Sequence, residues 1–180
     1  MHIPPLSDFG NRIMILGPTN AGKSTFTVAL ANTLEVPAIH LDRYRHLPNT
    51  MYEQRPDAEF KALHDEAAAL EGWVMDGSYS AHFPVRLPRT TGIIVLDESY
   101  LTRNWRYVWR TVFQKDRPGG LEGNQDKLTL EMFRWLWTTR NNSPEVRAWV
   151  SASGKPHVLT RNTAETNALY RAWGLRNPHA

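Results

Sequence analysis

Short apolar runs alternate with amphipathic segments along this chain. The runs are too short for helices, and they resemble buried parallel strands, which are apolar throughout because both faces are covered. Between them, apolar residues recur at helical spacing in segments that begin near residues 23, 57, 99, 128, 143 and 163. Strands that alternate with helices predict an α/β domain built on a parallel sheet with helices on both faces. The expected strands cover residues 12–16, 37–41, 73–75, 92–96 and 156–159.

Caps and breakers mark the expected ends of the helices. Asp57, Ser99 and Thr163 are predicted N-caps, and the segment Ser143-Pro144-Glu145 predicts a strong helix start. The segment 78–90 contains two prolines and is predicted to be irregular or partly helical. Polar, glycine-rich residues 115–126 predict a mobile loop.

Large side chains on the helices are expected mainly to fill the core. The helix that starts near residue 99 should bury its apolar side, and one of the helical tryptophans is a candidate for the wall of a base or substrate pocket. That apolar side consists of Leu101, Trp105, Val108 and Val112.

Composition limits the protein class more than the function. A chain of 180 residues with 41% hydrophobic residues suits a single domain, 1–180. It has no cysteine, which excludes disulfides and cysteine-ligated zinc and fits a reducing cytoplasm. No apolar run is long enough to span a bilayer, and residues 1–10 lack the features of a signal peptide. We therefore expect a cytoplasmic protein. A net charge of +3 does not by itself indicate a nucleic-acid partner, and the oligomeric state is undetermined.

The most informative segment joins the first predicted strand to the first predicted helix. It matches G-x-x-x-x-G-K-S directly after an apolar run, where glycines allow a sharp turn. Backbone N–H groups and the dipole of the helix N-terminus then favour phosphate. Lys23 is expected to reach the outer phosphates of ATP, and the Ser24 hydroxyl to hold Mg²⁺. A chance glycine loop is the alternative, but strand, loop and helix in register argue against it. The expected ATP-binding residues are Gly17, Thr19, Asn20, Ala21, Gly22, Lys23, Ser24 and Thr25.

Acidic residues end three of the predicted strands: Asp42, Asp76 and Asp97. In open α/β sheets the site lies at the carboxyl ends of the strands, so these acids should gather beside Lys23. Asp76 is the predicted magnesium ligand, with an ordinary Asp-Gly turn as the alternative. Asp42 could accept a proton from a substrate hydroxyl, hold metal or substrate, or cap a short helix. His40 is expected to be a structural histidine.

Basic residues follow the fourth predicted strand. They share one helix face and continue into the glycine-rich loop, so they predict a lid over roughly 111–127. Arginines stabilise the charge that spreads over a transferred phosphoryl group, and a closing lid excludes water. A solvated basic face is the alternative. The residues concerned are Arg103, Arg106, Arg110, Lys115 and Arg117.

At this point the chain resembles the nucleotide-kinase branch of P-loop proteins over nearly its whole length. Trp73-Val-Met-Asp76-Gly77 resembles the Asp-Gly signature of adenylate kinases, and the arginines after Asp97 resemble their entry into the lid. A closer resemblance is to the DNA topology modulation proteins, small adenylate-kinase-like proteins that share the phosphate loop, His40-Leu-Asp42 and a tryptophan-rich helix ending near Arg140. The resemblance implies a three-layer P-loop NTPase fold with a five-stranded parallel core, ATP, Mg²⁺ and a lid.

One departure concerns the phosphoryl acceptor. Adenylate kinases follow Asp-Gly with Phe-Pro-Arg, whose arginine grips the acceptor phosphate, whereas Ser78-Tyr79-Ser80 follows here. Arg86 lies too far along the chain to be a clear replacement, which argues against AMP as the acceptor.

The sequence therefore predicts an ATP-dependent kinase for a small nucleotide-like or hydroxylated acceptor. Expected catalytic residues are Lys23, Asp42, Arg103 and Arg106, with Ser24 and Asp76 at the metal. Expected acceptor-binding residues are Asp42, Arg43, Asp76, Tyr79, Arg110 and Arg117. The alternative is an ATP-dependent regulatory or DNA-topology-related binding protein with ATPase activity, although no DNA-reading motif is present.

Overall fold

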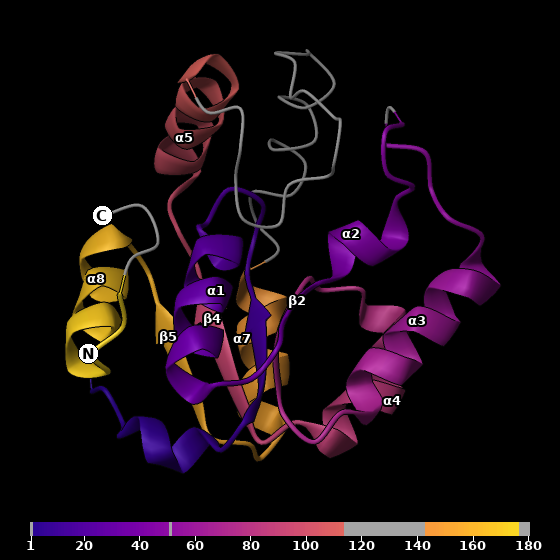
Figure 1. The fold of residues 1–180 in the computed structure, drawn as a ribbon. Helices are drawn as coiled ribbons and strands as arrows, with labels where there is room; N and C mark the ends of the chain where they lie inside the picture. The colour runs from indigo at the N-terminus through magenta and orange to yellow at the C-terminus, as the bar shows by residue number, and fades with distance from the viewer. Residues whose placement is uncertain (1, 51, 114–142, 177–180) are drawn as a thin grey trace.

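A five-stranded, all-parallel sheet forms the centre of the protein in the computed structural model, which describes residues 2–50, 52–113 and 143–176. The strand order is β2-β3-β1-β4-β5 (Figure 1). This arrangement confirms the expected α/β class and parallel sheet. The strands are β1 (Arg12–Leu16), β2 (Ala38–His40), β3 (Trp73–Asp76), β4 (Gly92–Leu96) and β5 (His157–Thr160).

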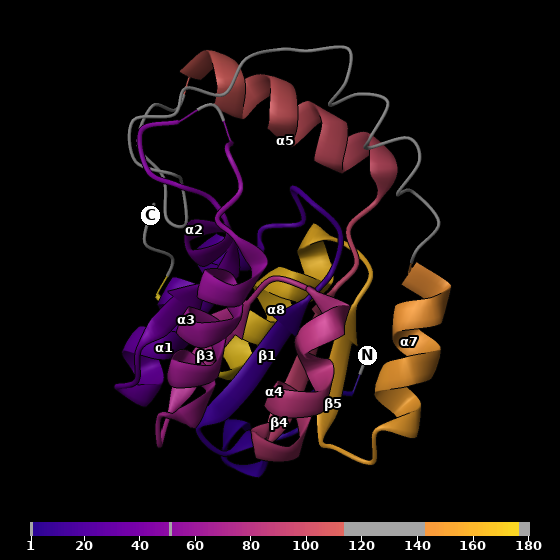
Figure 2. The ribbon, with the colours of Figure 1, turned by 90° about the vertical axis from the view of Figure 1, so that its right-hand side faces the viewer.

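Helices cover both faces of this sheet (Figures 1 and 2). One face packs against α1 (Lys23–Leu34), α8 (Thr163–Ala172) and the short 3₁₀ helix η1 (Leu6–Phe9). The other packs against α3 (Asp57–Ala69), α4 (Phe83–Arg89) and α7 (Ser143–Ala152). Successive residues of a strand point to opposite faces, so Ile13 and Ile15 join the first core while Met14 and Leu16 join the second. Both faces are therefore apolar, as the sequence pattern predicts.

The helix α5 (Tyr100–Phe113) crosses above the carboxyl ends of the strands (Figure 2). Its predicted apolar side is wrong, because Leu101 and Trp105 are 78% and 65% exposed. Arg103 and Tyr107 are the buried residues instead. α5 lies beyond the end of the sheet, so most of it has no apolar sheet face to cover. The side chain of Val112 is outside the described residues, and Val108 is half-buried.

The tryptophans divide between core and surface. Trp73 and Trp173 are buried, as expected for large aromatics. Trp105 and Trp109 are exposed and lie against each other, with ring centroids 6.2 Å apart. Core filling was therefore the wrong expectation for this pair on α5.

Two of the three predicted N-caps are displaced by one residue. Ser99 caps α5 as expected, since its hydroxyl accepts the N–H of Thr102. Pro56 rather than Asp57 precedes α3, and Asn162 rather than Thr163 caps α8 by accepting the N–H of Glu165. The predicted start of α7 at residue 143 is confirmed.

Two segments need further comment. Residues 78–90 form a 3₁₀ turn, η2 (Ser80–His82), and α4, whose first turn tolerates Pro84 because helix-start N–H groups need no partner in the helix. The glycine-rich loop 115–126, the part of the expected lid beyond residue 113 and the helix expected from 128 lie outside the described residues. Within the described ranges, no helix combines the length and apolarity needed to cross a membrane.

Candidate functional site

The loop between β1 and α1 has the backbone that an anion site requires. Gly17 has φ of 136°, and a side chain there would collide with the carbonyl oxygen of Leu96. Gly22 has φ of 93° and directly precedes α1, so the loop runs into the N-terminus of that helix, which favours anions. Lys23 Nζ donates to the carbonyl oxygen of Pro18 at 2.9 Å. The lysine thus lies back across the loop where a phosphate oxygen could replace that carbonyl.

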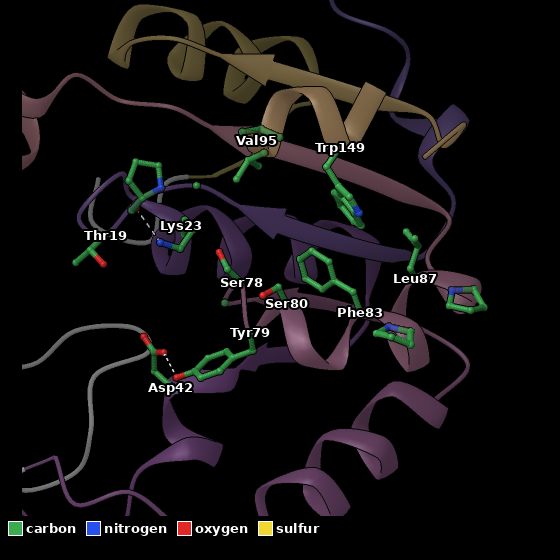
Figure 3. A pocket seen from close by; sticks show the side chains of 16 residues that line it. Thr19, Lys23, Asp42, Ser78, Tyr79, Ser80, Phe83, Leu87, Val95 and Trp149 are labelled. Carbon is green, nitrogen blue, oxygen red and sulfur yellow. Dashed lines mark hydrogen bonds between the residues drawn. The ribbon is translucent and has the colours of Figure 1, made fainter. Parts of the chain in front are cut away.

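A cavity of about 950 Å³ opens beside this loop (Figure 3). Thr19, Lys23 and Asp42 line one end of it, together with the loop backbone from Gly17. The segment Gly77 to Ser80 forms one wall. The sheet edge therefore brings together the loop that carries Lys23 and Asp42, which lies two residues beyond β2, as the sequence predicts.

Asp42 stands in the first turn of α2 (Leu41–Arg45), a helix that the sequence suggested only as a possibility. It does not cap this helix, because the N-cap is His40 and makes no side-chain cap bond. The Tyr79 hydroxyl donates to Asp42 Oδ1 at 2.6 Å. Burial, and then the Asp42 charge, raise the pKa of Tyr79 far above its ordinary range. Tyr79 therefore stays protonated and holds the carboxylate in place at neutral pH.

Asp76 is buried at the end of β3 and is 3% exposed. It is paired in register with His40 on β2, whose Nδ1 lies 2.7 Å from Asp76 Oδ2. The histidine expected to be structural is thus the partner of the expected metal ligand. Asp76 is not among the residues that line the cavity. Its Oδ1 makes no hydrogen bond with the residues that the structure describes.

Arg86 on α4 is a residue of the site that sequence reasoning did not identify. It is fully buried and donates to the carbonyl oxygens of Gly77 and Ser78 at 3.1 and 2.6 Å. Burial lowers the pKa of Arg86 to about 10, while the Asp76 charge acts in the opposite direction. The guanidinium therefore remains charged and, through these hydrogen bonds, holds the cavity wall at Gly77 and Ser78 against α4. No local pattern signals this contact.

One of the arginines of α5, Arg106, contacts the loop between β1 and α1. Arg106 donates to the Ala21 carbonyl oxygen at 3.1 Å, and lies 3.5 Å from a carboxylate oxygen of Glu98. Arg103 is buried, and burial lowers its pKa against the raising effect of Asp97. Its Nε and Nη1 have no hydrogen-bond partner in the described part of the chain. A solvated basic face was therefore the wrong alternative for Arg103.

The remaining predicted site residues do not line the cavity or lie outside the described residues. Ser24 and Thr25 are half-buried in the first turn of α1, and Arg43 is exposed on α2. The Arg110 side chain, together with Lys115 and Arg117, lies outside the described residues. Asp97, the third strand-end acid, pairs with Arg147 on α7.

A group of side chains that could hold a metal ion lies outside the cavity. His64, Asp65 and His82 offer ligand atoms within 4.8 Å of one another, from α3 and η2. Burial lowers the pKa of His64 and of His82, so both favour the neutral form. The ring of Phe60 lies between this group and Tyr79, 4.9 Å from His82 and 5.0 Å from Tyr79 by ring centroid. Because His82 is distant in the sequence from His64 and Asp65, no local pattern predicts this group.

The sequence matches no protein-family model and no curated protein. The function must accordingly be argued from the chemistry of the site.

Proposed function

We propose that this protein is an ATP-dependent kinase that transfers the γ-phosphoryl group to a hydroxyl group of a small molecule. The observation that carries the proposal is that Lys23, the phosphate loop and Asp42 line one cavity. A triphosphate site alone would suit many activities. A carboxylate beside it supplies what transfer to a hydroxyl additionally needs, namely a proton acceptor.

The donor side of the cavity supports triphosphate binding. Backbone N–H groups at the start of α1 and the Lys23 ammonium supply the donors that phosphate oxygens need. The parallel sheet and this loop together support a P-loop NTPase fold of the adenylate-kinase type, as the sequence resemblance implies. Arg106 contacts the loop at Ala21, from where its charge can stabilise the phosphates.

The oxygen ligands present fit magnesium. The Ser24 hydroxyl lies one residue beyond Lys23, and Asp76 keeps Oδ1 outside its contact with His40. Magnesium bound here would neutralise charge on the phosphates during transfer. His40 holds the Asp76 side chain in one orientation, in the way that outer partners orient metal ligands.

Asp42 is the proposed general base. As the acceptor oxygen forms its bond to the γ-phosphorus, the bond from that phosphorus to ADP breaks and Asp42 takes the hydroxyl proton. Tyr79 keeps the carboxylate oriented through its hydrogen bond to Oδ1. Arg103 has buried, unpaired donors in the described structure, which suit it to stabilise the charge on the moving phosphoryl group.

The test measures nucleotide binding and transfer separately. Mg-ATP should raise the melting temperature of the wild type, because a ligand that binds only the folded state stabilises it. Lys23→Met should lose this shift, while Lys155→Met, at the turn before β5, should retain it. Asp42→Asn should retain the shift and lose phosphoryl transfer by about a hundredfold or more. The proposal fails if no nucleoside triphosphate stabilises the wild type.

A second candidate is an ATP-dependent regulatory or DNA-binding ATPase. The exposed pair Trp105 and Trp109 on the arginine-rich helix α5 favours it, because bases stack on aromatic side chains. Affinity for single-stranded DNA at two salt concentrations tests it, with Trp105→Ala as the variant. Lack of binding at low salt, with and without Mg-ATP, would exclude this candidate.

A further inference from the structure

We infer that the phosphoryl acceptor is an uncharged aromatic molecule carrying a free hydroxyl group, and not a nucleoside monophosphate. This inference rests on the proposed kinase function, since it assigns the acceptor side of the same cavity. It is carried by the chemistry of the cavity wall beyond Asp42, for which the sequence had no decisive motif.

The cavity has two ends of different chemistry (Figure 3). At the phosphate-loop end stand Lys23 and Asp42. The other end is apolar and is formed by side chains from the consecutive elements α4 and β4 and from α7, which is distant along the chain. Its principal residues are Val95, Phe83, Leu87, Val146 and Trp149.

Charge is confined to the phosphate-loop end. Of the described residues that line the cavity, Lys23 and Asp42 alone carry charged side chains. Arg86 belongs to α4 but is buried, with its donors directed at the carbonyl oxygens of Gly77 and Ser78. Arg147 on α7 is paired with Asp97. A phosphate on the acceptor would enter an apolar region where the described residues offer no cation, and burying an unpaired charge is strongly unfavourable.

Aromatic side chains favour a flat acceptor. The rings of Phe83 and Trp149 lie against each other with centroids 4.4 Å apart and planes inclined by 32°. Trp149 is half-buried, so part of it remains available to the cavity. A sugar would leave most of its hydroxyl groups unpaired against this wall, whereas an aromatic ring gains by burial and by ring contacts.

Polar groups stand between the two ends. Figure 3 shows Ser78 and Ser80 between the phosphate-loop end and the aromatic end. An acceptor that reaches from Trp149 toward Asp42 would pass these hydroxyl groups, which can orient it without charge. The cavity volume of about 950 Å³ is ample for such a molecule beside the terminal phosphates. Aromatic alcohols and unphosphorylated nucleosides share the required chemistry, and the experiment separates them.

The experiment measures binding by ligand-detected NMR, without nucleotide and with ADP and magnesium. The probes are 2-phenylethanol, adenosine, AMP and glucose. Either 2-phenylethanol or adenosine should bind more tightly than AMP and glucose, and the probe that binds should become phosphorylated when Mg-ATP is added. Preference for adenosine assigns a nucleoside, and preference for 2-phenylethanol an aromatic alcohol. Preference for AMP or glucose, or no binding of either uncharged aromatic probe, overturns the inference.

Two variants and one control variant localise the binding. Trp149→Leu should weaken binding of the preferred aromatic probe about tenfold, because the ring contact is lost, and should leave the Mg-ATP stabilisation unchanged. Leu70→Ala, at an exposed position just after α3 and outside the cavity lining, is the control and should change neither. Ser80→Arg places a cation at an exposed position of the wall, and should shift preference from adenosine toward AMP. This second variant keeps the inference testable if Trp149→Leu does not fold.

The outcomes separate this inference from the proposed function. If Mg-ATP stabilises the protein but AMP is the preferred acceptor, the kinase function stands and the acceptor class is wrong. If an aromatic probe binds but no nucleotide does, the apolar end of the cavity is correctly assigned as the aromatic site and the kinase function is wrong. If Trp149→Leu and Ser80→Arg both bind the probes as tightly as the wild type does, the probes bind elsewhere and the inference is overturned.

Discussion

Arg86→Met offers the sharpest test of how the cavity wall is held. In the folded protein the Arg86 guanidinium is fully buried and donates to two carbonyl oxygens of the wall segment, those of Gly77 and Ser78. Methionine retains much of the apolar stem but removes both donors and the charge. The Gly77 carbonyl then stays buried without its partner, and Asp76 loses a nearby cation.

The expected loss follows from two opposing contributions. Hydrogen bonds from a charged donor contribute about 1.5–3 kcal/mol each, which gives about 3–6 kcal/mol for the pair. Burial of the charged guanidinium offsets part of this stabilisation, and the same burial lowers the pKa of Arg86 to about 10. Methionine does not carry this cost, so the variant recovers up to about 3 kcal/mol. That figure follows because the pKa of Arg86 falls from 12.5 to about 10, and each tenfold change in a protonation equilibrium is worth about 1.4 kcal/mol. We expect a net loss of about 2 kcal/mol in the free energy of unfolding.

The assay is equilibrium unfolding in urea at neutral pH, followed by tryptophan fluorescence and circular dichroism. The transition midpoint should fall while the slope stays unchanged. Arg89→Met is the matched control on the same helix, because the Arg89 guanidinium donates to one carbonyl oxygen in an exposed setting. It should cost less than about 1 kcal/mol. Equal losses in the two variants, or no loss in Arg86→Met, would refute the assigned role of Arg86.

Two further predictions concern the core and the phosphate loop. In the wild type, burial lowers the pKa of His64 from 6.5, so the unfolded chain binds more protons than the folded protein does. The free energy of unfolding of the wild type should therefore fall as the pH drops below about 6.5, and His64→Leu should reduce this fall. Urea midpoints between about pH 7.5 and 5.5 measure this, and a residual slope from His82, whose pKa is also lowered, should remain. Gly17→Ala should cost about 2 kcal/mol or more, because both its φ of 136° and the Leu96 carbonyl oppose a side chain. Gly154→Ala, at φ of 66° with open space around it, should cost only about 1–2 kcal/mol in thermal unfolding at equal buffer and scan rate.

Each of these two predictions has a contradicting result. A wild type and a His64→Leu variant with the same pH dependence would show that the buried imidazole does not titrate as assigned. A Gly17→Ala variant as stable as Gly154→Ala would show that the loop can relax away from β4.

Sequence and tertiary structure contributed different parts of the candidate site. The strand, loop and helix around Lys23 were predictable because they are contiguous: an apolar strand, glycines at the turn, Lys23 and a helix start. Asp42 and Asp76 were predictable in position, because parallel strands place their carboxyl ends at one edge of the sheet. The Asp76 contact with His40 depends on the register of β2 against β3, which no local pattern specifies.

The chain by itself determined the parallel α/β architecture and the glycine loop between β1 and α1, because both follow from local periodicity and from backbone chemistry over a few residues. Only the tertiary structure decided which side of α5 is buried, since that depends on what lies beneath the helix and not on its own pattern. It also decided that Arg86 fastens the cavity wall and that Val95, Phe83 and Trp149 meet at the apolar end. Contacts between residues so far apart follow from strand order and helix packing, and they set the part of the cavity that would select the acceptor.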